Sequence, residues 1–150
     1  MKFLRTDPSH PSFQKLVRLL DEELTSLYGA EMQIFNPHNI LKENAFSLLV
    51  LENEEPIGIG AFRILENPQE VEIKRMYVPP AHRGKGISKL ILEELEKWAM
   101  EENCTYAKLE TGVKNTAALG LYPRAGYQRI EPFGPYVVID NSICFGKKLK

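Results

Sequence analysis

Residues 71–92, VEIKRMYVPPAHRGKGISKLIL, predict a strand that passes through a glycine-rich turn into a helix. The first eight of these residues include β-branched and aromatic side chains, which favour strands. The strand is predicted to stop near Val78, because Pro79 and Pro80 cannot donate backbone hydrogen bonds. Beyond the turn, apolar residues from Ile87 onward recur at three- and four-residue steps, which is typical of a helix. We expect the rest of the chain to hold this unit in place.

The turn itself has the features of an anion site. Gly84 and Gly86 let a ligand approach the backbone, and the amides from Gly84 to Lys89 would be the unpaired donors of a helix N-terminus. Such donors suit a phosphate or pyrophosphate, and Arg83 and Lys85 add positive charge beside them. The turn fits neither the P-loop pattern nor the dinucleotide fingerprint. The alternative is a plain strand-to-helix turn with a solvated rim.

The turn resembles the acetyl-coenzyme A signature of the GNAT superfamily of N-acetyltransferases, Gln/Arg-x-x-Gly-x-Gly/Ala, through Arg83, Gly86 and Ser88. Ser88 departs from this pattern. It is still small, so the loop is expected to close, and its hydroxyl is expected to help cap the helix.

A second block, residues 115–127, resembles the family's short helix Asn-x-x-Ala-x-x-Leu-Tyr-x-x-x-Gly-Phe/Tyr. Asn115 suits the N-cap of this helix and Gly126 suits its C-terminus. Pro123 departs from the pattern, because it removes a backbone hydrogen bond and disfavours helical geometry at Tyr122. The direction of the Tyr122 hydroxyl is therefore left open.

The resemblance implies an α/β (α+β) fold for one N-acetyltransferase domain of residues 1–150. This fold is a mixed, mostly antiparallel sheet with helices on both faces and a splay between the fourth and fifth strands. Acetyl-coenzyme A would lie in the splay as co-substrate, with its pantetheine along the central strand and its pyrophosphate on the glycine turn. The implied cofactor-binding residues are Met76, Tyr77, Val78, Arg83, Gly84, Lys85, Gly86, Ile87, Ser88 and Asn115.

The implied reaction is direct transfer of an acetyl group from the thioester to an amine. A lysine-like amine with a pKa of about 10.4 needs roughly 4 to 5 kcal/mol to lose its proton at pH 7, so a base matters. Glu72 on the central strand is the first candidate, and Glu70, Lys74 and Glu110 are alternatives that could act through water or bind a charged acceptor. Each carboxylate could also be merely solvated or paired.

Tyr122 matches the family's acid. Full proton transfer from a phenol to the leaving thiolate is uphill by about 2 kcal/mol, so a hydrogen bond that strengthens as the charge develops is the expected role. Packing under the sheet is the alternative role for this tyrosine.

Six further segments are expected to be strands: residues 1–5, 45–51, 57–65 and 106–111, with 128–132 and 143–149 closing the sheet. A helix is expected from Pro11 to Gly29, with an apolar stripe that packs on the core. Residues 30–44 predict a loop that walls the acceptor side, with His38 as a possible base. Residues 133–136 predict a tight connection, in which Tyr136 either lines the acceptor pocket or packs.

Composition limits the possible partners. The 150 residues are 43% hydrophobic and 26% charged, with a net charge of -1, so no overall field attracts nucleic acid or an anionic membrane. Without a signal-peptide core or a membrane span, the cytoplasm is the expected compartment. Cys104 and Cys144 are expected to be buried thiols, and no metal site is expected.

The acceptor is expected to be a small primary amine, such as an amino-acid derivative. A protein or peptide amine is one alternative, and a coenzyme A sensor or scaffold without turnover is another. An exposed sheet edge near residues 143–149 could support a homodimer.

Overall fold

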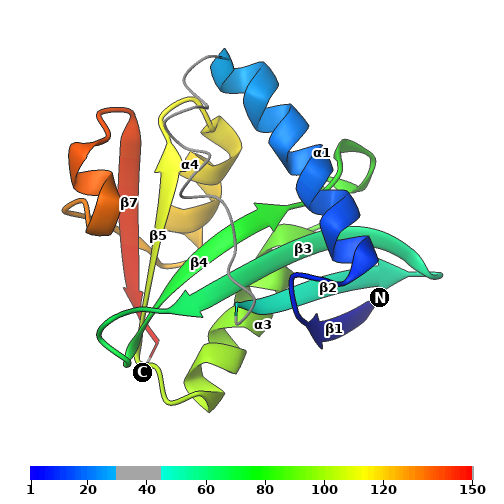
Figure 1. The fold of residues 1–150 in the computed structure, drawn as a ribbon, viewed down its shortest axis with the longest axis horizontal. Helices are drawn as coiled ribbons and strands as arrows, with labels where there is room; N and C mark the ends of the chain where they lie inside the picture. Colours follow the sequence, from blue (N-terminus) through cyan, green and yellow to red (C-terminus); the bar gives the residue numbers. More distant parts are fainter. Residues whose placement is uncertain (30–44, 150) are drawn as a thin grey trace.

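A computed structural model describes residues 1–29 and 45–149 of the chain. In this part of the chain, seven strands form one sheet in the order β1-β2-β3-β4-β5-β7-β6 (Figure 1). Only the β4–β5 pair is parallel among the strand pairs of the described residues. The strands are β1 (Lys2–Thr6), β2 (Phe46–Glu52), β3 (Glu55–Ile64), β4 (Glu70–Tyr77), β5 (Tyr106–Gly112), β6 (Gln128–Ile130) and β7 (Ser142–Lys148).

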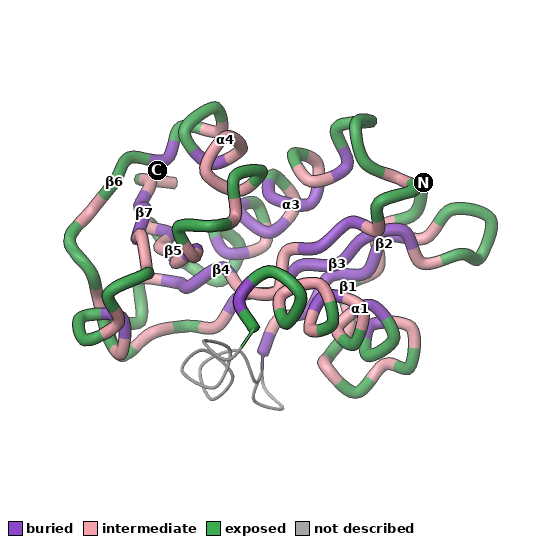
Figure 2. The backbone as a smooth tube through the Cα atoms, turned by 90° about the horizontal axis from the view of Figure 1, so that it is seen from above, coloured by how far each residue is buried: buried purple, intermediate pink, exposed green. Residues whose placement is uncertain are grey.

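Helices cover both faces of the sheet, as expected from the sequence (Figure 2). Helix α1 (Pro11–Tyr28) packs on one face, where Phe13 and Leu16 are buried against Leu49 and Ile59. Helices α3 (Ile87–Glu101) and α4 (Thr116–Arg124) contribute to the larger core on the other face. Two 3-10 turns, η2 (Pro80–His82) and η3 (Gly134–Val138), complete the elements of the described residues. The mixed, mostly antiparallel fold is therefore confirmed.

Close packing of α3 on the sheet depends on a glycine in β3. A Cβ atom built on Gly60 would lie 2.7 Å from Cγ2 of Ile91 and 2.8 Å from Cδ1 of Leu95, closer than real carbon atoms approach. Both leucine and isoleucine are fully buried at this contact. Because Gly60 has no side chain, α3 and the turn that precedes it can pack directly against the central strands.

The predicted splay between β4 and β5 is present. The two strands pair from Glu70 to Ile73 on β4 and from Tyr106 to Leu109 on β5, and their pairing ends there. Beyond this point β4 stays paired with β3, and β5 stays paired with β7. The backbone of the second half of β4 therefore has an edge that faces a gap in the sheet instead of a neighbouring strand.

A bulge in β4, which the sequence did not indicate, lies just beyond Ile73, where the pairing with β5 ends. Ile59 of β3 is opposite Tyr77 and Ala61 is opposite Lys74, so β4 has one extra residue in this interval. Arg75 lies within it with a φ of 57°, which is unusual for a residue other than glycine. Bulges of this kind bend a strand and redirect its side chains, often beside active sites.

Two expectations about the end of the chain are wrong. Residues 143–149 do not form a sheet edge, because β7 is inserted between β5 and the short β6, which is itself the edge strand. The basis for a dimer along β7 is therefore lost. The connection from β6 to β7 is also not tight, because it spans residues 131–141 and contains η3.

Pro123 does not break α4, contrary to the expectation of a disturbed helix. It lies in the last turn, where a missing amide removes only one hydrogen bond. A Schellman motif then closes the helix: Gly126 N–H donates to the Pro123 carbonyl and Tyr127 N–H donates to the Tyr122 carbonyl, at 3.1 and 3.0 Å. Gly126 has the positive φ of 95° that this motif requires.

The predicted loop of residues 30–44, with His38, lies outside the described residues. Cys104 and Cys144 are both free and buried, as expected. None of the helices in residues 1–29 and 45–149 has the length and apolar character needed to span a membrane.

Candidate active site

A cleft opens where β4 and β5 separate. Its volume is 1030 Å³, at the upper end of the roughly 300–1,000 Å³ typical of ligand pockets, so it has room for more than one small ligand. Its walls come from the second half of β4, the end of β5, the loop before α3, the exposed side of α4 and the last turns of α1. All of the predicted cofactor residues except Lys85 line it.

The glycine turn has the geometry expected of an anion site. Gly84 and Gly86 have φ angles of 83° and 77°, and a Cβ atom built on either would meet no atom of the described residues within 4 Å. Gly86 is the N-cap of α3, and the first intrahelical bond runs from Leu90 N–H to its carbonyl. The preceding amides have no carbonyl of this helix to pair with, so they are available to a ligand. Gly86 occupies the N-cap position, and α3 has no side-chain capping hydrogen bond among the described residues, so the predicted role of Ser88 at the cap is wrong.

Arg83 is turned toward α1. Its Nε donates to the Val78 carbonyl at 2.7 Å, its Nη2 lies 2.7 Å from Oε1 of Glu23, and its guanidinium lies over the Tyr77 ring. The arginine therefore ties α1 to the end of β4 at the edge of the cleft. Lys89 lines the cleft beside the turn, whereas the sequence predicts Lys85 at this place.

Tyr122 lies in α4 and lines the cleft while its ring is buried. Asn115 begins this helix and accepts a hydrogen bond from Ala118 N–H at 3.2 Å, which confirms the predicted cap. The Schellman motif places Tyr127 against Tyr122, with ring centroids 5.8 Å apart. Burial, together with the negative charge of Glu110, raises the pKa of Tyr122 well above its usual value. The phenol therefore stays protonated and can act as a hydrogen-bond donor.

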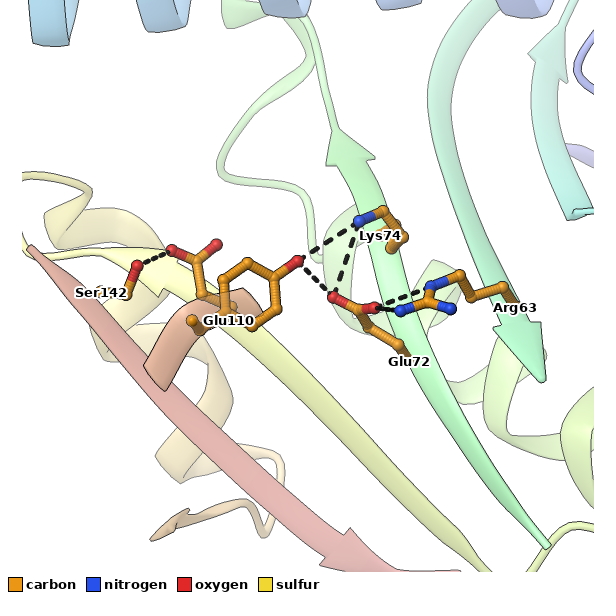
Figure 3. A network of polar contacts seen from close by, with 6 residues as sticks. Arg63, Glu72, Lys74, Glu110 and Ser142 are labelled. Atoms are coloured by element: carbon orange, nitrogen blue, oxygen red, sulfur yellow. Dashed lines mark hydrogen bonds and ion pairs between the residues drawn. The ribbon is translucent and has the colours of Figure 1, made fainter. Parts of the chain in front are cut away.

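Glu72 is at the centre of a buried polar cluster on the α1 face of the sheet (Figure 3). One carboxylate oxygen accepts hydrogen bonds from Arg63, whose Nε and Nη2 lie 2.9 and 2.8 Å away. The other accepts from the Tyr136 hydroxyl at 2.5 Å and lies 3.6 Å from Nζ of Lys74. Glu72 is 1% exposed and is not among the described residues that line the cleft. Tyr136 is likewise buried and anchors η3 to the sheet. Of the two roles expected for this residue, lining the acceptor pocket or packing, the structure supports packing.

Glu110 and Lys74 line the cleft on the two separating strands (Figure 3). Burial raises the pKa of Glu110, although the hydrogen bond from the Ser142 hydroxyl, at 2.6 Å, acts in the opposite direction. Burial also lowers the pKa of Lys74, and the charge of Glu72 partly offsets this effect. Both side chains can therefore change protonation state closer to neutral pH than free carboxylates or amines do.

Sequence reasoning missed the contribution of α1. The apolar stripe of this helix was expected only to pack on the core, yet Leu24, Leu27 and Tyr28 line the cleft. The Tyr28 hydroxyl accepts a hydrogen bond from Lys114 N–H at 3.2 Å, which joins the end of α1 to the loop before α4. A pattern of apolar residues does not show which turn of a helix extends past the core. Arg75 was also missed, because no local signal marks a bulge.

The fold and the cleft together define a transferase of the acyl-coenzyme A-dependent class. Residues 13–127 match the Acetyltransferase (GNAT) family, and the chain belongs to this family. It is 32% identical over 146 residues to an IAA acetyltransferase from Azospirillum brasilense, with 97% of this chain and 95% of that protein aligned.

Solved structures agree with this assignment. A protein of Klebsiella pneumoniae assigned to the acyl-CoA N-acyltransferases superposes with a TM-score of 0.84, at 29% identity, over 99% of this chain and 97% of that one. The PaiA N-acetyltransferase from Thermoplasma acidophilum, in complex with coenzyme A, shares the fold with a TM-score of 0.71 at 17% identity, over 99% of both chains. The protein is thus an N-acetyltransferase that uses an acyl-coenzyme A.

Proposed function

We propose that this enzyme transfers the acetyl group of acetyl-coenzyme A directly to the primary amine of a small molecule, such as an amino-acid derivative, within one domain of residues 1–150. The observation that carries this proposal is the cleft itself. It joins a turn suited to a pyrophosphate with the buried phenol of Tyr122 and the half-buried carboxylate of Glu110.

In this proposal the cofactor follows the splay. The backbone of Met76 and Tyr77, on the edge of β4 that faces the gap, and of Val78 directly after β4 would pair with the amide groups of pantetheine, as a further strand would. The Val78 carbonyl also accepts a hydrogen bond from Nε of Arg83. The pyrophosphate would bind the amides from Gly84 to Ser88, with Lys89 nearby. Asn115 would position α4, and Arg83 would remain with Glu23 or turn toward a phosphate.

We assign the role of general base to Glu110 in preference to Glu72. Glu72 is paired with Arg63 and Tyr136, so a proton taken up there would weaken a partly buried ion pair and a buried hydrogen bond. Glu110 lines the cleft, has a raised pKa and keeps one oxygen bonded to Ser142. A base of this kind can accept the amine proton directly or through water. Glu72 would then hold the neighbouring strand and η3 in place.

Tyr122 would stabilise the departing thiolate. Because its pKa is raised, the phenol is a poor proton donor to the leaving thiolate, whose thiol has an ordinary pKa of about 8.5, and a charge-stabilising hydrogen bond is the favoured role. The net charge of -1, with acidic and basic residues interspersed along the sequence, favours a small acceptor over a nucleic acid.

The test is thiol release from acetyl-coenzyme A with a panel of amines, amino acids and peptides, with the N-acetyl product identified by mass spectrometry. We expect turnover of at least one small primary amine, and Glu110→Gln should lower kcat by roughly 100-fold or more. In wild type kcat should fall as pH decreases through the raised pKa of Glu110, because the protonated carboxyl cannot accept a proton.

Ser142→Ala is the companion variant. It removes the hydrogen bond that stabilises the charged form of Glu110, so the pKa should rise further and the acidic limb should move to higher pH. An acidic limb that stays in place in Ser142→Ala and survives in Glu110→Gln would exclude Glu110 as the base. Binding of coenzyme A without turnover of any amine would favour a sensor or scaffold.

A further inference from the structure

Arg75 is a buried cation whose hydrogen bonds are incomplete. Its side chain is 7% exposed, and its Nη2 lies 2.9 Å from Oδ1 of Asp21 on α1. Within residues 1–29 and 45–149, Nε and Nη1 of Arg75 are buried and have no hydrogen-bond partner. Each unsatisfied buried donor is costly, and the cost is greater when the group is charged. Such a group in a ligand cleft indicates a partner that comes with the ligand.

Among residues 1–29 and 45–149, the carboxylates near this arginine are already engaged. Asp21 contacts only Nη2, and Glu23 pairs with Arg83. Glu72 is bonded to Arg63 and Tyr136, and Glu110 is bonded to Ser142. The β4 residue next to Arg75 is a lysine that also lines the cleft and cannot accept a hydrogen bond. In the described part of the chain, no nearby carboxylate is therefore left to accept a hydrogen bond from Nε or Nη1 of Arg75.

The bulge explains how an arginine comes to occupy this place. The positive φ of Arg75 interrupts the alternation of β4 and turns its side chain to α1, on the face of the sheet opposite α3. The glycine turn that suits the pyrophosphate begins α3. An anion at Arg75 would thus lie on the face of the sheet opposite α3, whose first amides are the proposed site of the cofactor's pyrophosphate.

We propose that Arg75 is a binding site for a carboxylate of the acceptor, so that the acceptor is an amine with an acidic group, as in an amino acid. This inference rests on the proposed function and names the substrate class for that site. A carboxylate oxygen at Nε or Nη1 supplies a charge-assisted hydrogen bond to a donor that is otherwise unsatisfied. The amine of the same molecule would then be held between the splayed strands, with Glu110 on one side.

The first experiment compares amino acids with their primary amides as acceptors, by kcat/KM for thiol release. The amide has the more readily deprotonated amine, so amine basicity alone favours the amide. We expect wild type to prefer the free acid by at least about tenfold, and Arg75→Gln to lose about 10- to 100-fold in kcat/KM for the acid, mainly through KM. Turnover of the amide should change by less than about threefold.

Two variants act as controls. Arg5→Gln removes an arginine that forms an ion pair with Glu101 outside the cleft, so acid preference should be unchanged. Arg75→Lys keeps the charge but not the planar set of donors, so it should show an intermediate loss and confirm that the site tolerates substitution.

Calorimetry should give the same acetyl-coenzyme A affinity for Arg75→Gln as for wild type. A weaker affinity would overturn the inference, because it would assign Arg75 to the cofactor.

The second experiment needs no turnover. Succinate, which has carboxylates but no amine, is titrated into the coenzyme A-loaded protein, and we expect binding to wild type but not to Arg75→Gln. If no amine is acetylated while succinate binds through Arg75, the proposed function fails and the carboxylate site stands. If amides are acetylated as well as acids and succinate does not bind, the inference is overturned and the proposed function stands.

Discussion

Two glutamates of this protein, Glu72 and Glu110, differ in their chemistry because the fold brings different partners to them. Glu72 and Glu110 lie on neighbouring strands and on the same face of the sheet. Glu72 meets an arginine and a tyrosine from distant parts of the chain, whereas Glu110 meets one serine and the cleft. A carboxylate with two strong donors is a structural anchor, and one with a single donor and a raised pKa is suited to proton transfer.

The same comparison predicts different effects for two tyrosines. Tyr122→Phe keeps the ring that packs on Tyr127, so we expect folding and acetyl-coenzyme A affinity to be retained. We expect kcat to fall by roughly 10- to 1,000-fold, the range for loss of one charge-stabilising donor. Rapid-mix thiol release, measured where chemistry limits turnover, checks this, and a kcat within about twofold of wild type would remove Tyr122 from the mechanism.

Tyr127→Phe is the matched control. Its hydroxyl donates to Oε2 of Glu96 at 2.9 Å in the core, away from the cleft. Its loss should lower the free energy of unfolding by about 1.5–3 kcal/mol and leave kcat near that of wild type.

At the scale of elements, the site depends on how a helix begins. Helix α3 starts from a glycine at positive φ, and the absence of a side chain there leaves the surface over its first amides open. Helix α4 ends in a Schellman motif that tolerates Pro123 and keeps Tyr122 facing the cleft. The two helix ends thus set the positions of the proposed pyrophosphate site and the proposed thiolate site.

A pair of variants at Gly86 tests the first of these sites. Gly86→Asn and Gly86→Asp add side chains of nearly equal size at a φ of 77°, which asparagine and aspartate tolerate better than most residues. Only the aspartate adds a negative charge where the pyrophosphate would bind. We expect calorimetry to show a loss of acetyl-coenzyme A affinity of at least about tenfold for Gly86→Asp relative to Gly86→Asn. Equal affinities for the two variants would contradict a pyrophosphate at this turn.

At the scale of the whole molecule, two cores on opposite faces hold the sheet, and the cleft lies where that sheet opens. The β4–β5 pairing on one side of the opening and the packing of α3 against β3 on the other keep the strands at their separation. Glu110 takes no part in these contacts, whereas Tyr122 belongs both to the larger core and to the cleft wall.

Two glycine substitutions should separate packing from backbone entropy. In Gly60→Ala the new methyl group collides with Ile91 and Leu95, so we expect a loss of about 1–3 kcal/mol in the free energy of unfolding. In Gly120→Ala, within α4, the nearest atoms are 3.6 Å away, so we expect a gain of about 0.5–1 kcal/mol. Thermal unfolding should shift by about 2–4 °C per kcal/mol in opposite directions, and shifts of the same sign would refute the packing argument.

Much of the fold could be predicted from the sequence because its signals are local. The strand from residue 71, the turn with two glycines, the end of α1 at Gly29 and the cap at Asn115 each follow from residues a few positions apart. A strand, a helix and a second strand also predict the parallel pair and, with the family resemblance, the splay.

The tertiary structure alone decided the rest, because those features depend on residues that are distant in the chain. The sequence does not show that β7 enters between β5 and β6, that Arg83 turns to Glu23, or that Arg75 occupies a bulge. The position of Glu72 in a strand predicted that it is the base. Its partners, however, are Arg63 of β3 and Tyr136 of η3, and Tyr136 lies more than sixty residues after Glu72 in the chain. Local propensity determines which elements form, whereas burial and long-range partners determine which of their side chains remain available for chemistry.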